Sequence, residues 1–107
     1  MWIDQKFIVL SNLLKNENGS LLDLGSRDQI LKRFIPNKIK YTGADISSNK
    51  ENTNIIIDLN KKLEFENNSF DFVTSLDVAE HLEEPKFFFE ECLRVSKRKV
   101  FVVLPNI

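Results

Sequence analysis

The sequence has little cysteine and glycine and no long hydrophobic run. Its 107 residues include one cysteine, Cys92, and three glycines. A single cysteine excludes a disulfide framework and a CxxC metal site, and its place in an apolar helical stretch predicts a small core residue. No apolar segment approaches the roughly 20 residues that span a bilayer, and the N-terminus does not read as a signal peptide. We therefore expect no membrane association and a cytoplasmic location.

An excess of basic charge is also absent. The chain has 15 Lys and Arg against 16 Asp and Glu, which gives a net charge of −1. A balance of this kind provides no electrostatic footprint for nucleic acid, so no nucleic-acid partner is indicated. The one dense basic cluster, residues 97–99, is predicted to end a helix, where cations suit the helix dipole.

Hydrophobic periodicity predicts strands that alternate with helices. The spacing of apolar residues predicts an amphipathic helix over 3–15, a second helix over 26–34 capped by Ser26 or Asp28, and a third from Pro85 to about Lys97. A polar connection without a helix is expected over 47–53, and a turn of helix over 77–82. The five predicted strands are 21–24, 40–46, 54–59, 70–76 and 99–104. Because of its β-branched isoleucines, 54–59 is predicted to be buried.

Alternation of strands and helices predicts an α/β domain with a parallel sheet covered by helices. The length favours one domain over residues 1–107, with an N-terminal helix in 1–18 and a binding core in 20–107. No repeat or low-complexity segment interrupts it.

Carboxylates lie at the ends of four of the predicted strands. Asp23, Asp45 and Asp58 lie at the tips of the first three, and Asp77 follows the fourth. Parallel sheets bind ligands at the carboxyl ends of their strands, and an apolar run ending in Gly25 followed 20 residues later by Asp45 is typical of a nucleoside site. Arg27 and Ile30 stand where a dinucleotide fingerprint has glycines, which disfavours NAD.

Several stretches then resemble one family, the class I S-adenosylmethionine-dependent methyltransferases of the type 11 kind. The resemblance covers roughly residues 20–106, and its most specific part is 69–82. It implies a Rossmann-like three-layer sandwich with a mostly parallel five-stranded sheet in the order 3-2-1-4-5. It also implies S-adenosylmethionine as cofactor and methyl transfer to an acceptor that is a small molecule or sugar-linked. The matching stretches are 21–25, 41–46, 57–59, 69–82 and 100–106.

The resemblance implies a set of cofactor-binding residues, which are Asp23, Gly25, Arg27, Asp45, Ile46, Asp58, Leu59 and Leu76. Asp45 would accept hydrogen bonds from both ribose hydroxyls, and Asp58 with the Leu59 backbone would face the adenine edge. Gly25 would let the methionine portion approach the backbone, with Leu76 near that end. Asp23 would orient the loop or reach the α-ammonium group through water.

The glycine loop departs from the family pattern. Alternate glycines of the family are replaced here, after Gly25, by Arg27 and Gln29. In one interpretation Arg27 turns outward or meets the cofactor carboxylate. In the other, Arg27 and Gln29 fill part of the pocket, and cofactor affinity is weak or lost.

A second motif with two interpretations consists of Asp77, Glu80 and His81. On a helical turn, Asp77 and Glu80 would share a face with His81 beside them. Some relatives use such residues to hold a divalent cation, which makes these three weak candidate metal ligands, and His81 is a weak candidate general base. The alternative is a pair of structural hydrogen bonds at the pocket mouth, with no metal.

The resemblance also implies a missing C-terminal part. The family continues past the fifth strand, whereas this chain stops at Ile107. The fifth strand would then be an open edge, which predicts a fragment of a longer protein, a homo-oligomer or a partner protein that covers it. The alternative function is a catalytically inactive methyltransferase-like module that acts through protein interaction.

Overall fold

The computed structural model describes residues 4–47 and 54–105, and these form one sheet between two helical layers. The sheet has five strands in the order β3-β2-β1-β4-β5, and every strand pair in it is parallel. The predicted Rossmann-like fold and strand order are confirmed. The strands are β1 (Gly19–Leu24), β2 (Ile39–Asp45), β3 (Ile55–Ile56), β4 (Phe70–Leu76) and β5 (Ser96–Val103).

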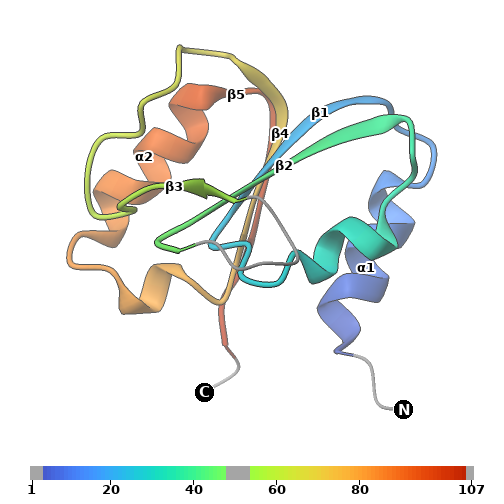
Figure 1. The fold of residues 1–107 in the computed structure, drawn as a ribbon, viewed down its shortest axis with the longest axis horizontal. Helices are drawn as coiled ribbons and strands as arrows, with labels where there is room; N and C mark the ends of the chain where they lie inside the picture. The colour runs from blue at the N-terminus through green and yellow to red at the C-terminus, as the bar shows by residue number, and fades with distance from the viewer. Residues whose placement is uncertain (1–3, 48–53, 106–107) are drawn as a thin grey trace.

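The two faces of the sheet have separate cores because successive side chains of a strand alternate between faces. Leu22 and Leu24 of β1 pack with α2 (Pro85–Val95), whereas Leu21 packs with α1 (Gln5–Leu14). Figure 1 shows α1 on one side of the central strands and α2 on the other. Cys92 is fully buried in the α2 core, and burial raises the pKa of its thiol to about 12, as expected of a core cysteine.

The prediction of a helix over 26–34 is wrong for the first half of that segment. Only a 3-10 helix, η1 (Ile30–Phe34), forms there, and it carries no side-chain cap. Arg27 and Gln29 have positive φ angles of 51° and 57°, which are incompatible with a helix at those positions. Ser26, expected as a cap, instead donates a hydrogen bond from its hydroxyl to Asn54 Oδ1 at 2.6 Å.

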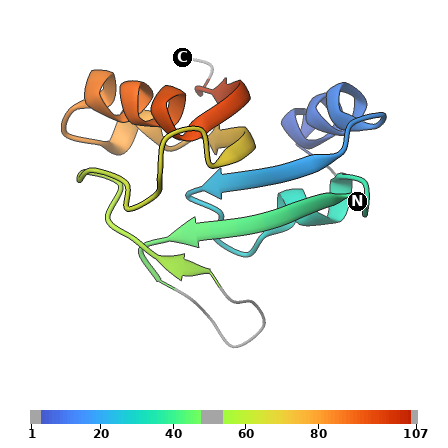
Figure 2. The same cartoon turned by 90° about the horizontal axis from the view of Figure 1, so that it is seen from above.

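The edge strand β3 is shorter and more exposed than predicted. Only two residue pairs join it to β2, Ala44 with Ile55 and Asp45 with Ile56. Ile56 is 70% exposed because no further strand or helix of the described chain lies beyond it. Figure 2 shows β3 as a short arrow at the rim of the sheet. Most of the connection predicted over 47–53 lies outside the described residues.

The basic cluster 97–99 lies in a strand, which corrects its prediction as a helix end. The helix α2 ends at Val95, and the chain enters β5 directly at Ser96, whose backbone is extended. Pairing of this segment with β4 outweighs the helical pattern that the sequence suggests. Among the described residues, no helix has the length and apolar character needed to cross a membrane.

Candidate functional site

Two adjoining pockets lie at the carboxyl ends of the central strands. The β2 pocket, of about 200 Å³, is bounded by the loop after β1, the ends of β2 and β3, and the turn η2 (Ala79–His81). The α1 pocket, of about 270 Å³, lies between the same loop and the start of α1. Both pockets are lined by Gly25, Arg27 and Asp77, so these residues mark the boundary between them.

The structure brings all the predicted cofactor-binding residues to these two pockets. The β2 pocket contains most of them, namely Gly25, Arg27, Asp45, Ile46, Asp58 and Leu59. Asp23 and Leu76 line the α1 pocket, together with Gly25 and Arg27. Strand ends that are far apart in the sequence meet here because the sheet is parallel.

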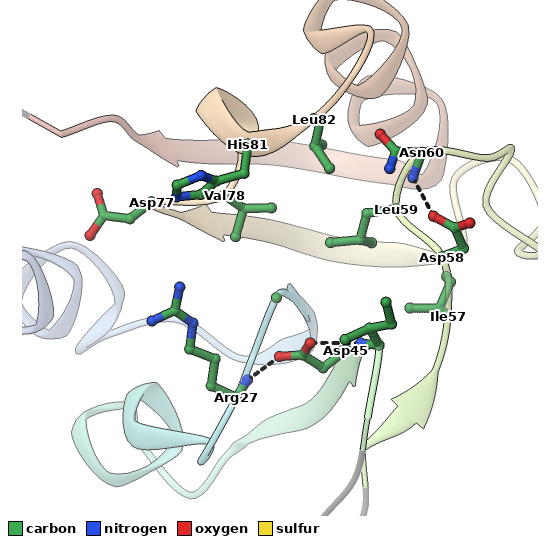
Figure 3. Close-up of a pocket in the computed structure, with 12 residues that line it drawn as sticks. Arg27, Asp45, Ile57, Asp58, Leu59, Asn60, Asp77, Val78, His81 and Leu82 are labelled. Carbon is green, nitrogen blue, oxygen red and sulfur yellow. Dashed lines mark hydrogen bonds between the residues drawn. The ribbon is translucent and has the colours of Figure 1, made fainter.

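The Asp45 carboxylate is fixed by two backbone groups at the end of β2. Its Oδ2 accepts from the Arg27 N–H at 2.6 Å, and its Oδ1 accepts from the Ile46 N–H at 2.6 Å. Figure 3 shows the Asp45 carboxylate beside the Arg27 backbone at the pocket wall, with its hydrogen bonds as dashed lines. Each oxygen of a carboxylate can accept a further hydrogen bond, so Asp45 is a preoriented acceptor with two free positions.

The loop after β1 keeps a glycine-like backbone although it contains one glycine. Gly25 has a φ of 78°, and a Cβ at this position would lie 2.3 Å from Val78 Cγ2. Arg27 and Gln29 adopt positive φ angles as well, at the positions where the family has glycines. The loop therefore carries other side chains than glycine on a left-handed backbone that glycine adopts readily.

The two replaced glycines differ in where their side chains lie. Gln29 is buried away from both pockets, and its Nε2 donates to Asn54 Oδ1 at 2.7 Å. Asn54 also donates to the Arg27 carbonyl at 2.8 Å, which ties the loop to the start of β3. The Arg27 side chain is exposed and lines both pockets, and Figure 3 shows its guanidinium extending toward the side where Asp77 and His81 lie. Gln29 thus fills no part of either pocket.

Asp23 is a buried carboxylic acid behind the loop. It is 3% exposed, and it accepts hydrogen bonds from the Tyr41 hydroxyl at 2.6 Å and the Thr74 hydroxyl at 2.9 Å. Burial raises the pKa of Asp23 to about 6, and the two hydrogen bonds only partly oppose this effect. Burial, together with the charge of Asp23, also raises the pKa of Tyr41, which keeps its hydroxyl protonated as a donor.

The raised pKa of Asp23 predicts a loss of stability as the pH rises. An acid whose pKa is higher in the folded state stabilises the fold below its unfolded pKa of 3.8, and this contribution disappears as the pH passes through about 6. Relative to Asp23→Asn, the wild type should lose on the order of 3 kcal/mol of unfolding free energy between pH 4 and pH 7. Urea unfolding of both proteins at unit pH intervals measures this difference.

Asp71→Asn provides a control for which the pH dependence of stability has the opposite sign. A hydrogen bond from the Ser20 backbone N–H holds the pKa of Asp71 below its ordinary value. The wild type should therefore gain stability relative to this variant as the pH rises through the acidic range. A parallel pH dependence in both comparisons would contradict the assignment to Asp23.

The candidate metal ligands do not converge. Asp77 precedes η2 with a φ of 57°, and its carboxylate pairs with Lys6. His81 Nε2 lies 3.8 Å from Glu80 Oε2, and its side chain is 70% exposed. Across residues 4–47 and 54–105, no group of three His, Cys, Asp or Glu side chains is arranged to hold a metal ion. Asp77 and His81 line the β2 pocket, whereas Glu80 lies outside both pockets.

Sequence reasoning missed Lys6, which lines the α1 pocket. Its Nζ pairs with Asp77 across 71 positions of the chain and also lies 3.2 Å from Asp4 Oδ2. Nothing in the local pattern of the first helix distinguishes this lysine from an exposed one. The carboxylate of Asp58 is held in a local turn, in which its Oδ1 accepts from the Asn60 N–H at 2.9 Å (Figure 3).

Comparison with solved structures shows the same fold in methyltransferases. A SAM-dependent methyltransferase from Aquifex aeolicus matches with a TM-score of 0.63 and 22% identity over 87% of this chain and 57% of its own. A proposed methyltransferase from Bacillus halodurans matches with a TM-score of 0.72 and 18% identity over 91% of this chain and 48% of its own. The chain thus spans about half the length of these structures.

A third structure is the complex of the Haloferax volcanii Trm112 methyltransferase activator with a proposed methyltransferase. It matches with a TM-score of 0.67 and 18% identity over 87% of this chain and 48% of the matched one. No curated protein matches the sequence. A family of methyltransferase domains matches residues 22–104, which is most of the chain. The chain therefore belongs to the methyltransferase domain family.

Proposed function

We propose that this chain is the S-adenosylmethionine-binding core of a methyltransferase. The observation that supports the proposal most directly is the pair formed by Asp45 and Gly25. Asp45 presents a fixed carboxylate to the β2 pocket, and the Gly25 backbone forms the boundary where that pocket meets the α1 pocket. A carboxylate at this position suits a ribose diol, and a bare backbone beside it suits a ligand that crosses the boundary.

The two pockets fit two parts of such a ligand. In this proposal the adenosine portion occupies the β2 pocket, with Leu59 and Val78 beside the base, and the methionine portion occupies the α1 pocket. Small-ligand sites usually measure about 300–1,000 Å³. Neither pocket reaches this range alone, whereas the volumes of the two together fall within it. A ligand that fills both therefore passes over Gly25, where any side chain would collide with Val78.

The chemistry expected at this site needs positioning above all. Bound S-adenosylmethionine supplies a methyl group on a sulfonium for in-line displacement. The role proposed for this chain is to hold the ribose at Asp45 and the loop at Gly25, which fixes the orientation of the ligand. His81 lines the β2 pocket and stays a candidate base for an acceptor, and the acceptor class stays a prediction from the sequence.

Calorimetry with S-adenosylmethionine, S-adenosylhomocysteine and NAD tests the proposal. We expect the first two compounds to bind and NAD to give no heat of binding. Binding of NAD alone would overturn the assignment. Absence of binding by all three would favour the alternative of an inactive module that acts through protein interaction.

Asp45→Asn is expected to weaken binding of S-adenosylhomocysteine by about 100-fold. The amide retains one acceptor oxygen where the carboxylate has two, and hydrogen bonds to a charged group contribute about 1.5–3 kcal/mol each. Asp71→Asn is the matched control, because Asp71 lies at the opposite end of the strands and bonds to Ser20. Equal affinity in the two variants would exclude a ribose contact at Asp45.

A homo-oligomer or a partner protein is the second part of the proposal. The strands β3 and β5 form the two edges of the described sheet, and the exposed apolar side chains include Val102 within β5 and Leu104 just after it. Open edges with apolar side chains favour association. A fold relative occurs in complex with the Trm112 methyltransferase activator, which is consistent with a protein partner. The cytoplasmic location stays a prediction from the sequence.

A further inference from the structure

An ion pair occupies the α1 pocket, between the first helix and the end of β4. Lys6 on α1 pairs with Asp77, which directly follows β4, and both line this pocket. The two side chains are 19% and 32% exposed, so each is partly withdrawn from solvent. Lys6 lies outside residues 22–104, the part of the chain that matches the methyltransferase domain family. The pair therefore joins α1, which lies outside the matched residues, to the end of β4.

The charges around this pocket are of both signs. Lys6 and Arg27 supply two cations, and Asp4, Asp77 and the buried Asp23 supply three carboxyl groups. A ligand that carries one charge of each sign can replace the partners of a partly buried ion pair. Each buried charge then keeps a partner of opposite sign, which is supplied by the ligand. The α-amino acid end of S-adenosylmethionine carries such a carboxylate and ammonium group.

We propose that Lys6 binds the carboxylate of the methionine portion and Asp77 binds its ammonium group, so that the ligand replaces the Lys6–Asp77 pair. This inference rests on the proposed function and specifies which residues bind the amino acid end of S-adenosylmethionine. It makes α1 a part of the ligand site. The helix is held in place by Leu10 and Leu14 in the core and by Phe7, whose ring stacks on Phe34 at 5.4 Å.

Lys6 also has the position required for this exchange. Its Nζ has a second partner, Asp4 Oδ2 at 3.2 Å, which is the N-cap residue of α1. Asp4 would remain to neutralise the helix start when Lys6 turns to a ligand carboxylate. Burial disfavours the charged lysine, but the hydrogen bonds and charges of Asp77 and Asp4 outweigh this effect and raise the pKa of Lys6. Lys6 thus stays cationic at neutral pH.

The test compares two adenosine compounds that differ at the amino acid end. S-adenosylhomocysteine carries the carboxylate and ammonium groups, whereas 5′-methylthioadenosine lacks both. We expect Lys6→Met to weaken binding of S-adenosylhomocysteine about 10-fold and to leave that of 5′-methylthioadenosine within two-fold of wild type. Lys6→Arg should restore most of the affinity because it restores the charge. Lys15→Met, an exposed lysine at the end of the same helix, is the matched control.

Two results would overturn the inference, and a third would overturn the proposed function. Equal weakening of both compounds by Lys6→Met would mean that Lys6 acts only by holding α1 in place. Unchanged affinity for both would exclude a contact with the carboxylate. Failure of wild-type protein to bind either compound would instead overturn the proposed function, so the two failures are distinguishable. Thermal unfolding of each variant verifies that it is folded at the temperature of the binding measurement.

Discussion

Gly25→Ala is expected to weaken binding of S-adenosylhomocysteine by about 100-fold and to lower the free energy of unfolding by about 2 kcal/mol. The added Cβ would lie 2.3 Å from Val78 Cγ2, so either Val78 or the loop must move. Both form the boundary of the β2 pocket, which the proposed ligand crosses. The φ of 78° also disfavours an L side chain. Calorimetry and urea unfolding measure the two effects.

Gly19→Ala separates the loss of binding from the loss of stability. Gly19 begins the same strand that Gly25 follows, has a φ of 123°, and would place its Cβ 2.4 Å from Asp71 Oδ2. Its substitution should destabilise the fold by a similar amount at the end of β1 away from the pockets. We expect wild-type affinity for S-adenosylhomocysteine in this variant. A similar loss of affinity in both variants would show that the weaker binding results from lower global stability and not from a change in the pocket.

Arg94→Met is expected to lower the free energy of unfolding by about 3–4 kcal/mol. Arg94 donates to both oxygens of Glu91, at 2.9 and 3.0 Å, and to the carbonyls of Leu63 and Phe65 at 2.8 and 2.7 Å. These bonds fasten the loop before β4 to α2. Without the guanidinium, the largely buried Glu91 keeps only the Leu63 N–H at 2.9 Å, and two carbonyls lose their donor. Urea unfolding at neutral pH measures the change.

Arg98→Met is the matched control for this loss. Arg98 is more exposed and pairs with Glu17 at 3.0 Å, and its guanidinium lies 4.8 Å from the centre of the Phe72 ring. Exposed contacts of this kind contribute about 1 kcal/mol or less each. The double variant Glu91→Leu with Arg94→Met removes both charges and should be more stable than the sum of the single effects predicts. Strict additivity would contradict a coupled Glu91–Arg94 pair.

The central strands were predictable because their apolar patterns are strong and the segments on either side of them are predicted as helices or turns. The strand β4 (Phe70–Leu76) has the predicted bounds, and the bounds of β1 and β2 differ from prediction by one or two residues. The edge strand β3 and the helix predicted over 26–34 were less predictable. Ile55 and Ile56 have the composition of a buried strand, but sheet order leaves them at an edge, and order is a property of the whole chain.

The positions of the site residues followed from the sequence, whereas their contacts did not. A parallel sheet brings the ends of its strands to one edge, so the pocket location of Asp45 and Asp58 needed only the strand assignments. Hydrogen bonds between distant segments carry no local signal. The pairs of Asp23 with Tyr41 and Thr74, and of Lys6 with Asp77, are of this kind.

The contacts of Asn54 have a consequence for how the ligand loop acquires its shape. Arg27 and Gln29 would not choose left-handed backbone angles by themselves, and the bonds that hold them come from Asp45, 18 positions after Arg27, and from Asn54, 25 positions after Gln29. We therefore expect the loop to be fully ordered only once both β2 and Asn54 are in place, which makes pocket assembly a late step of folding. Loss of the Asn54 hydrogen bonds is then expected to disorder the pocket while the central strands remain intact.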